Sequence, residues 1–113
     1  MVRQAERSEV EKFQLWDDEN AGHEFVVVER DGNVVGFAQY DSGVNDATIH
    51  FIEAESVGKG IGSELIGWFK EEFNELTTTN TNPHCQKFLE AKGFEVYGKK
   101  DWQGNATMKW WND

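Results

Sequence analysis

The sequence predicts a mixed α+β domain, in which a mostly antiparallel sheet of about six strands is flanked by about three helices. β-branched and aromatic residues gather in short runs, such as residues 25–28, and these favour strands. Apolar residues recur with helical spacing between residues 60 and 73. Gly, Asn and Asp lie between the runs, where turns are expected. A chain of 113 residues is the size of one domain, so we expect a single domain over residues 1–113.

The N-terminal part predicts a helix followed by a hairpin. Residues 3–16 carry apolar side chains among charges at loosely helical spacing, and Ser8 is a candidate cap for a shorter helix. Residues 17–22 are polar and end in Gly, which is typical of a loop. Residues 23–29 and 34–40 are then expected as two strands, joined by a tight turn at Asp31-Gly32.

The central part predicts a third strand and the main helix. Residues 41–46 are rich in turn formers, and residues 47–53 alternate in polarity, which completes an antiparallel meander. The helix is expected over residues 60–73, with one apolar side packed on the sheet.

The C-terminal part predicts three further strands and a short helix. The threonine-rich residues 75–81 favour a strand, after which Asn82 is a suitable N-cap and Pro83 a suitable first residue for a helix that ends at Gly93. Strands are expected at residues 94–98 and 106–111, separated by a polar turn.

Composition excludes several classes of function. The formal net charge is −10, with 21 acidic residues against 11 Lys and Arg, so the chain lacks the basic face that a nucleic acid requires. An acidic surface steers a cationic acceptor inward, and it is also a general device for solubility. No apolar run reaches the length of a membrane span, so we expect no membrane contact and a soluble cytoplasmic protein. Cys85 is the only cysteine, which excludes an intrachain disulfide and a cysteine cluster for a metal.

The segment Val57–Ser63, with glycines at every second position, predicts an anion-binding turn. It lies between a strand and a helix, so its backbone amides open onto a helix N-terminus that favours phosphate. Neither the Walker spacing nor the dinucleotide spacing fits, because Lys59 lies between the glycines and Ser63 stands where a third glycine is required. Glycines can also serve a turn for steric reasons alone, so the alternative of a purely structural turn stays open.

Three segments in order resemble the GNAT N-acetyltransferases. Residues 51–63 resemble the family's central motif, a strand followed by Gly-x-Gly, and residues 82–94 resemble its second motif, an asparagine opening a short helix that closes on Gly-Phe. Residues 25–38 resemble the hairpin that enters the same sheet. The resemblance covers roughly residues 23–111 and implies the GNAT fold, with acetyl-coenzyme A as co-substrate and no metal.

The resemblance also implies a cofactor site where the strand ending near Glu53 diverges from the threonine strand. Main-chain amides of the glycine segment would bind the pyrophosphate, and those of the strand end would pair with the pantetheine arm. Asn82 would reach the pantetheine amide or act only as a helix cap. The implied cofactor-binding residues are Phe51, Ile52, Val57, Gly58, Lys59, Gly60, Ile61, Gly62, Ser63, Asn82, Cys85 and Phe88.

Acetyl transfer to an amine requires a proton acceptor, for which Glu53 is the first candidate, with Glu55 and His50 behind it. Each of them could equally be a surface residue with no such task. Leu89 stands where the family's second motif usually has the tyrosine that protonates the departing thiolate, so Tyr97 is the candidate donor, with Tyr40, His84 or water as alternatives.

Two further departures from the family pattern bear on function. Val57 replaces the usual Arg or Gln, and only about twenty residues precede the first expected strand, which suggests a shortened wall on the acceptor side and an open site. We therefore expect an N-acetyltransferase that acts on a protein or peptide amine or on a small amine. The alternatives are a catalytically weak acetyl-coenzyme A sensor and an unrelated α+β binding domain. Exposed tryptophans near the end, Trp102, Trp110 and Trp111, could form a homodimer interface or cover the site.

Overall fold

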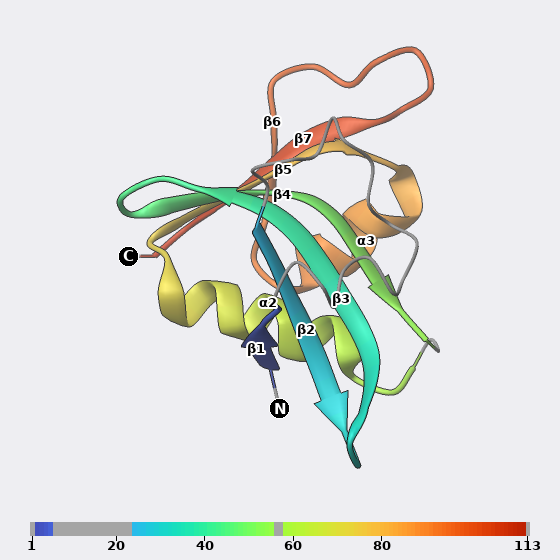
Figure 1. Cartoon of the computed structure of the whole chain (residues 1–113). Helices are drawn as coiled ribbons and strands as arrows, with labels where there is room; N and C mark the ends of the chain where they lie inside the picture. Colours follow the sequence, from blue (N-terminus) through green and yellow to red (C-terminus); the bar gives the residue numbers. More distant parts are fainter. Residues whose placement is uncertain (1, 6–23, 56–57, 113) are drawn as a thin grey trace, which may run out of the picture.

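The computed structural model describes residues 2–5, 24–55 and 58–112 (Figure 1). In this part of the chain seven strands and two helices follow one another: β1 Val2–Gln4, β2 Glu24–Arg30, β3 Asn33–Ser42, β4 Asp46–Ala54, α2 Ile61–Glu72, β5 Glu75–Thr81, α3 Pro83–Ala91, β6 Glu95–Tyr97 and β7 Ala106–Trp111.

All seven strands form one sheet in the order β1-β2-β3-β4-β5-β7-β6. Every neighbouring pair is antiparallel except β4 and β5, which run parallel and are connected through α2. The predicted meander of β2, β3 and β4 is confirmed. Its first turn is at Asp31-Gly32, where φ is 53° and 80°, because a two-residue hairpin turn requires left-handed backbone at both positions.

Helices α2 and α3 contribute to one core cluster on one face of the sheet (Figure 1). The residues Ile61, Leu65, Ile66 and Phe69 form the buried side of α2, and the spacing of these four follows the helical period. Each buried side chain of this size contributes roughly 1.5–3 kcal/mol by leaving water. Leu89 of α3 joins the same cluster, so the two helices are fixed relative to the strands that they flank.

The N-terminal segment departs from the prediction. Arg3 and Gln4, expected in a helix, lie in β1, which pairs antiparallel with residues 26–28 of β2 at the sheet edge. A three-residue strand is too short to carry a periodicity of its own, and the exposed edge of a β-branched strand decides its conformation instead. The remainder of the predicted helix, Ser8 included, and the predicted loop 17–22 lie outside the described residues. Elsewhere the observed bounds match the predicted ones or differ from them by one or two residues.

Candidate functional site

The sheet splits between its two parallel strands. β4 and β5 pair only from Asp46 and Glu75 to Ile49 and Thr78, after which β4 continues beside β3 and β5 beside β7. Both strands are irregular where they part. In β4 the register against β3 skips one residue, His50, and in β5 the register against β7 shifts between Thr78 and Thr81. Because a bulge bends its strand, two bulges at one level account for the separation.

A cleft of about 580 Å³ opens where the strands part. Its walls come from the diverging ends of β4 and β5 and from the first turns of α3, and they are mostly apolar with a few polar groups. This is the composition expected of a site for a small molecule. The residues lining the cleft are Ile49, His50, Phe51, Ile52, Thr78, Thr79, Thr81, Asn82, Cys85, Phe88 and Leu89.

A turn of residues 58–60, which we call the glycine turn, leads into α2. Gly58 and Gly60 have φ of 83° and 76°, left-handed values that other residues adopt only with strain. Gly60 is the N-cap and offers no side-chain bond to the helix, so the first amides of α2 remain available to a ligand. A Cβ atom on Gly62 would lie 3.2 Å from Cζ of Phe88, which places the start of α2 against the wall of the cleft.

Two side chains, Asn82 and Gln86, hold the start of α3 in place. Asn82 Oδ1 accepts a hydrogen bond from the Cys85 backbone N–H at 2.8 Å, so this side chain caps the helix. The buried Gln86 donates from Nε2 to the carbonyl oxygens of Thr81, at 2.8 Å, and Gly104, at 2.7 Å. These bonds fix α3 to the end of β5 and to the loop before β7, and they keep the α3 wall of the cleft in place.

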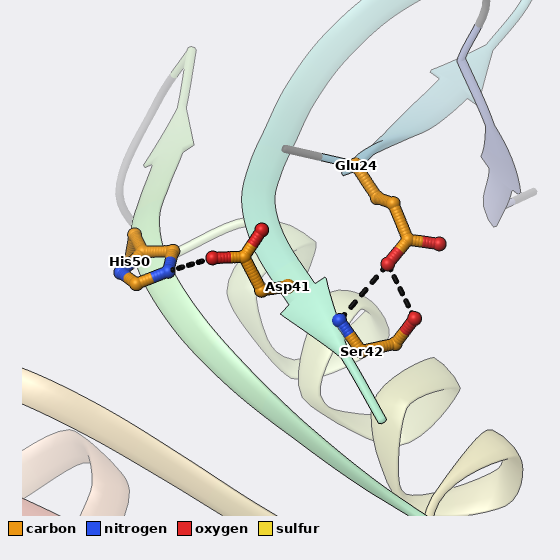
Figure 2. A network of polar contacts seen from close by, with 4 residues as sticks. All are labelled: Glu24, Asp41, Ser42 and His50. Carbon is orange, nitrogen blue, oxygen red and sulfur yellow. Dashed lines mark hydrogen bonds and ion pairs between the residues drawn. The ribbon is translucent and has the colours of Figure 1, made fainter. Parts of the chain in front are cut away.

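Figure 2 shows a polar network beside the bulge in β4. His50 Nε2 lies 2.8 Å from Asp41 Oδ2 on the neighbouring strand, so the carboxylate orients the imidazole ring (Figure 2). The adjacent Ser42 donates to Glu24 Oε2 from its backbone N–H at 2.9 Å and from its hydroxyl. Glu24 thereby ties the start of β2 to the end of β3, next to Asp41. The bulge therefore gives the cleft a histidine that is held by a carboxylate.

The predicted cofactor residues fall into two adjoining groups. Phe51, Ile52, Asn82, Cys85 and Phe88 line the cleft. The other described members occupy the glycine turn and the first turn of α2. Ile61 among them is buried in the core, so only its backbone can face a ligand. Val57 lies outside the described residues.

The three predicted catalytic residues lie apart from the cleft lining. Glu53 is exposed on β4, one residue beyond the lining residue Ile52. Glu55 borders a second hollow, beside Arg30 and Lys59. Tyr97 is on the edge strand β6, where its ring lies beside Trp111 and Lys109. Tyr40, an alternative donor, is fully buried, and this burial raises the pKa of its phenol, which disfavours it as an acid.

Sequence reasoning did not name the threonines of β5 or Arg30 as part of the site. The run Leu76-Thr77-Thr78-Thr79 was a signal, since Thr78 and Thr79 line the cleft. Arg30 precedes a hairpin turn, and no sequence pattern around it predicts its contact with the glycine turn.

Comparison with known proteins agrees with this geometry. The family model of the Acetyltransferase (GNAT) domain matches residues 21–96. No curated protein is similar enough in sequence to count as a relative. Among solved structures, a ribosomal-protein-alanine N-acetyltransferase from Brucella melitensis is similar with a TM-score of 0.67 at 20% identity, over 99% of each chain.

Two other solved structures have the same fold at lower identity. A GCN5-related N-acetyltransferase from Rhodopseudomonas palustris has a TM-score of 0.73 at 15% identity, over 99% of this chain and 95% of that one. A PaiA N-acetyltransferase from Thermoplasma acidophilum, solved in complex with coenzyme A, has a TM-score of 0.69 at 14% identity, over 99% and 98%. None of the described helices is long and apolar enough to span a membrane.

Proposed function

This chain belongs to the GNAT acetyltransferase family, and we propose that it transfers the acetyl group of acetyl-coenzyme A to a primary amine by direct attack in a ternary complex. The observation that carries the proposal is the continuity of two features. The first feature is the cleft between the diverging strands β4 and β5, and the second is the glycine turn with the start of α2. The two features adjoin at Phe88. A long, narrow cofactor with a phosphate group partway along its length fits this combination.

The chain's own residues suit acetyl-coenzyme A. Backbone amides of the glycine turn and of the first turn of α2 would bind its pyrophosphate, since helix N-termini favour anions. β5 does not pair with β4 beyond Ile49, so the backbone of Phe51 and Ile52 would pair with the pantetheine arm as an added strand does. The bound cofactor supplies the activated thioester. Cys85 and Phe88 would wall the pocket around it.

The reaction forms an N–C bond, breaks the C–S bond and requires two proton transfers. The acceptor amine gives a proton to a base, and the departing thiolate takes one from an acid or from water. We propose two alternative candidates for the general base, both on β4. Glu53 is the residue predicted from the sequence, and His50 lines the cleft and is oriented by Asp41. Glu53 directly follows the lining residue Ile52, whereas Glu55 borders a second hollow and Tyr97 lies on the edge strand β6. Glu55 as a base and Tyr97 as a proton donor are therefore weaker proposals.

Variants at these positions distinguish the two bases. The general base takes a proton from the acceptor amine, and a neutral side chain in its place cannot do so. Replacement of the base should therefore lower kcat by about 10²–10⁴-fold and leave the affinity for acetyl-coenzyme A unchanged. His50→Gln and Glu53→Gln are compared at saturating acetyl-coenzyme A. Asp41→Asn should reproduce part of the His50→Gln loss, and an unchanged rate in both His50→Gln and Asp41→Asn would leave Glu53 as the base.

A second function is favoured by one specific observation. Leu89 stands where the family motif usually has tyrosine, and its aliphatic side chain has no proton to donate. It is buried in the core cluster at 4% exposure, as a packing residue is. A protein that binds acetyl-coenzyme A and turns it over slowly would act as a sensor or an interaction module. The thiolate is a weak base, however, and water can protonate it near neutral pH.

An assay of thiol release with a panel of amines tests the proposal. Peptide and protein lysines, protein N-termini, polyamines and aminoglycosides are offered with acetyl-coenzyme A, and the net charge of −10 leads us to expect that cationic acceptors are preferred. Amine-dependent release supports the transferase. Tight binding without release by any amine supports the sensor instead.

A further inference from the structure

Arg30 connects the end of β2 to the glycine turn and to the start of α2, with partners 29 and 34 residues away in sequence. It is the last residue of β2, and its guanidinium donates from Nη1 to the Lys59 carbonyl oxygen at 2.9 Å and from Nη2 to Glu64 Oε2 at 2.7 Å. Lys59 lies in the glycine turn and Glu64 in the first turn of α2. One planar group therefore ties the β2–β3 hairpin, whose tip is the lowest point in Figure 1, both to the turn and to the helix start.

We propose that Arg30 is a positioning residue that presets the backbone of the glycine turn for the phosphates of acetyl-coenzyme A. The inference rests on the proposed function, because it assigns a task in that same cofactor site. Arg30 is not itself placed in the cleft, and its effect is transmitted through Lys59 and Glu64.

Arg30 fixes the orientation of one peptide plane in the glycine turn. The Lys59–Gly60 peptide is trans, so its carbonyl and its N–H point in opposite directions. Holding the Lys59 carbonyl toward Arg30 therefore turns the Gly60 N–H away from Arg30. The next plane is fixed as well, because the Gly60 carbonyl accepts the first helical hydrogen bond, from the Glu64 N–H at 3.0 Å.

Arg30 also reduces the conformational entropy that the glycine turn loses when the cofactor binds. Gly58 and Gly60 have unusually many backbone states to lose, and a cofactor that had to order them would bind more weakly. The nearest heavy atom to a Cβ placed on Gly60 is Nη2 of Arg30, at 3.9 Å, so the guanidinium lies directly beside this residue. The contact orders the turn before the cofactor arrives.

Arg30 also offsets a negative charge beside the proposed phosphate site. Glu64 places a carboxylate in the first turn of α2, close to where the phosphates would bind, and like charges repel. Arg30 pairs with that carboxylate and draws it toward the hairpin. Without Arg30 the carboxylate would oppose the phosphates.

Calorimetric titration with acetyl-coenzyme A tests the inference on five proteins: wild type, Arg30→Gln, Arg30→Lys, Arg30→Gln with Glu64→Gln, and Lys109→Gln. We expect Arg30→Gln to raise Kd by about tenfold or more, since it loses charge-assisted bonds to the turn. The Arg30→Lys variant should also bind acetyl-coenzyme A weakly, because an ammonium group lacks the planar set of donors with which the guanidinium binds both acceptors. The double variant should recover part of the loss. Lys109, which pairs with Glu75 on the far side of the sheet, is the matched control and should bind as wild type does.

Amide hydrogen exchange without cofactor supplies a readout that does not depend on binding. Exchange of the Glu64 N–H, which donates to the Gly60 carbonyl, should accelerate in Arg30→Gln. The melting temperature should stay within a few degrees of wild type, because a single surface ion pair contributes little to stability. Unchanged Kd and exchange in a folded Arg30→Gln variant would overturn the inference. Full rescue by Lys would also overturn it, in favour of a simple charge effect. Absence of binding by the wild type would overturn the proposed function itself.

Discussion

Two glycines of α2 provide a matched pair for testing where the cofactor binds. Gly62 is in the first turn of the helix, and a Cβ there would lie 3.2 Å from Cζ of Phe88. Gly67 is exposed five residues later, and a Cβ placed on it would have no neighbouring heavy atom within 4 Å. Both positions have ordinary helical backbone, so alanine itself introduces no conformational strain.

The two substitutions should separate stability from binding. Gly67→Ala should raise the free energy of unfolding by about 0.5–1 kcal/mol, the usual difference between Gly and Ala in a helix, and leave binding unchanged. Gly62→Ala should gain less stability, because its methyl group must displace the ring of Phe88 by a few tenths of an ångström. The displaced ring narrows the cleft and the methyl group stands beside the helix amides, so Kd for acetyl-coenzyme A should rise by about tenfold, or about 1.4 kcal/mol.

Chemical denaturation gives the stabilities and calorimetry gives the dissociation constants. A Gly62→Ala protein that binds within twofold of wild type would refute the reasoning, because the start of α2 would then not face the cofactor. Weaker binding by Gly67→Ala would refute it too, since that change is remote from the cleft.

Three further outcomes are expected. Bound acetyl-coenzyme A should slow the reaction of Cys85, the only thiol of the chain, with a disulfide reagent, and an unchanged rate at saturation would place the cofactor elsewhere. Gly36→Ala should lower the free energy of unfolding by about 1–3 kcal/mol, because its Cβ would collide with Cγ2 of the buried Ile61, and a loss below about half a kcal/mol by denaturation would contradict this close packing. Burial raises the pKa of Tyr40, so the phenol ionises first in the unfolded chain, and the free energy of unfolding should fall as pH rises above about 10. The Tyr40→Phe variant loses the hydrogen bond from Gln4, but its free energy of unfolding, measured by urea titration, should decline less steeply at alkaline pH. An equally steep decline in this variant would show that Tyr40 is not its cause.

Much of the fold could be predicted from the sequence because local signals agree with the tertiary structure. The Asp31-Gly32 turn, the apolar stripe of α2 and the Asn82-Pro83 start of α3 each have a chemistry that permits few alternatives. β1 could not be predicted, since three residues become a strand only because an edge of β2 is there to pair with them.

The site was predicted in part for the same reason. The glycine turn follows from local sequence, whereas the diverging strands were expected only from the resemblance to the GNAT family. The His50–Asp41 pair follows from the register of the neighbouring strands β3 and β4, and the Arg30–Glu64 contact follows from the packing of the end of β2 against α2. Local sequence does not reveal either of them. The bulge at His50 is decisive, because a shift of one residue changes which side chains of β4 share a face.

The most direct test of the account is calorimetric titration of the purified protein with acetyl-coenzyme A, beside a Gly60→Trp variant. Residue Gly60 has left-handed backbone at the N-cap of α2, so a large side chain there should block the amides that would meet the phosphates. The account predicts saturable binding of one cofactor per chain by the wild type and none by the folded variant. Equal binding by both proteins, or no binding by the wild type, would contradict the claim that the glycine turn and the cleft form the cofactor site.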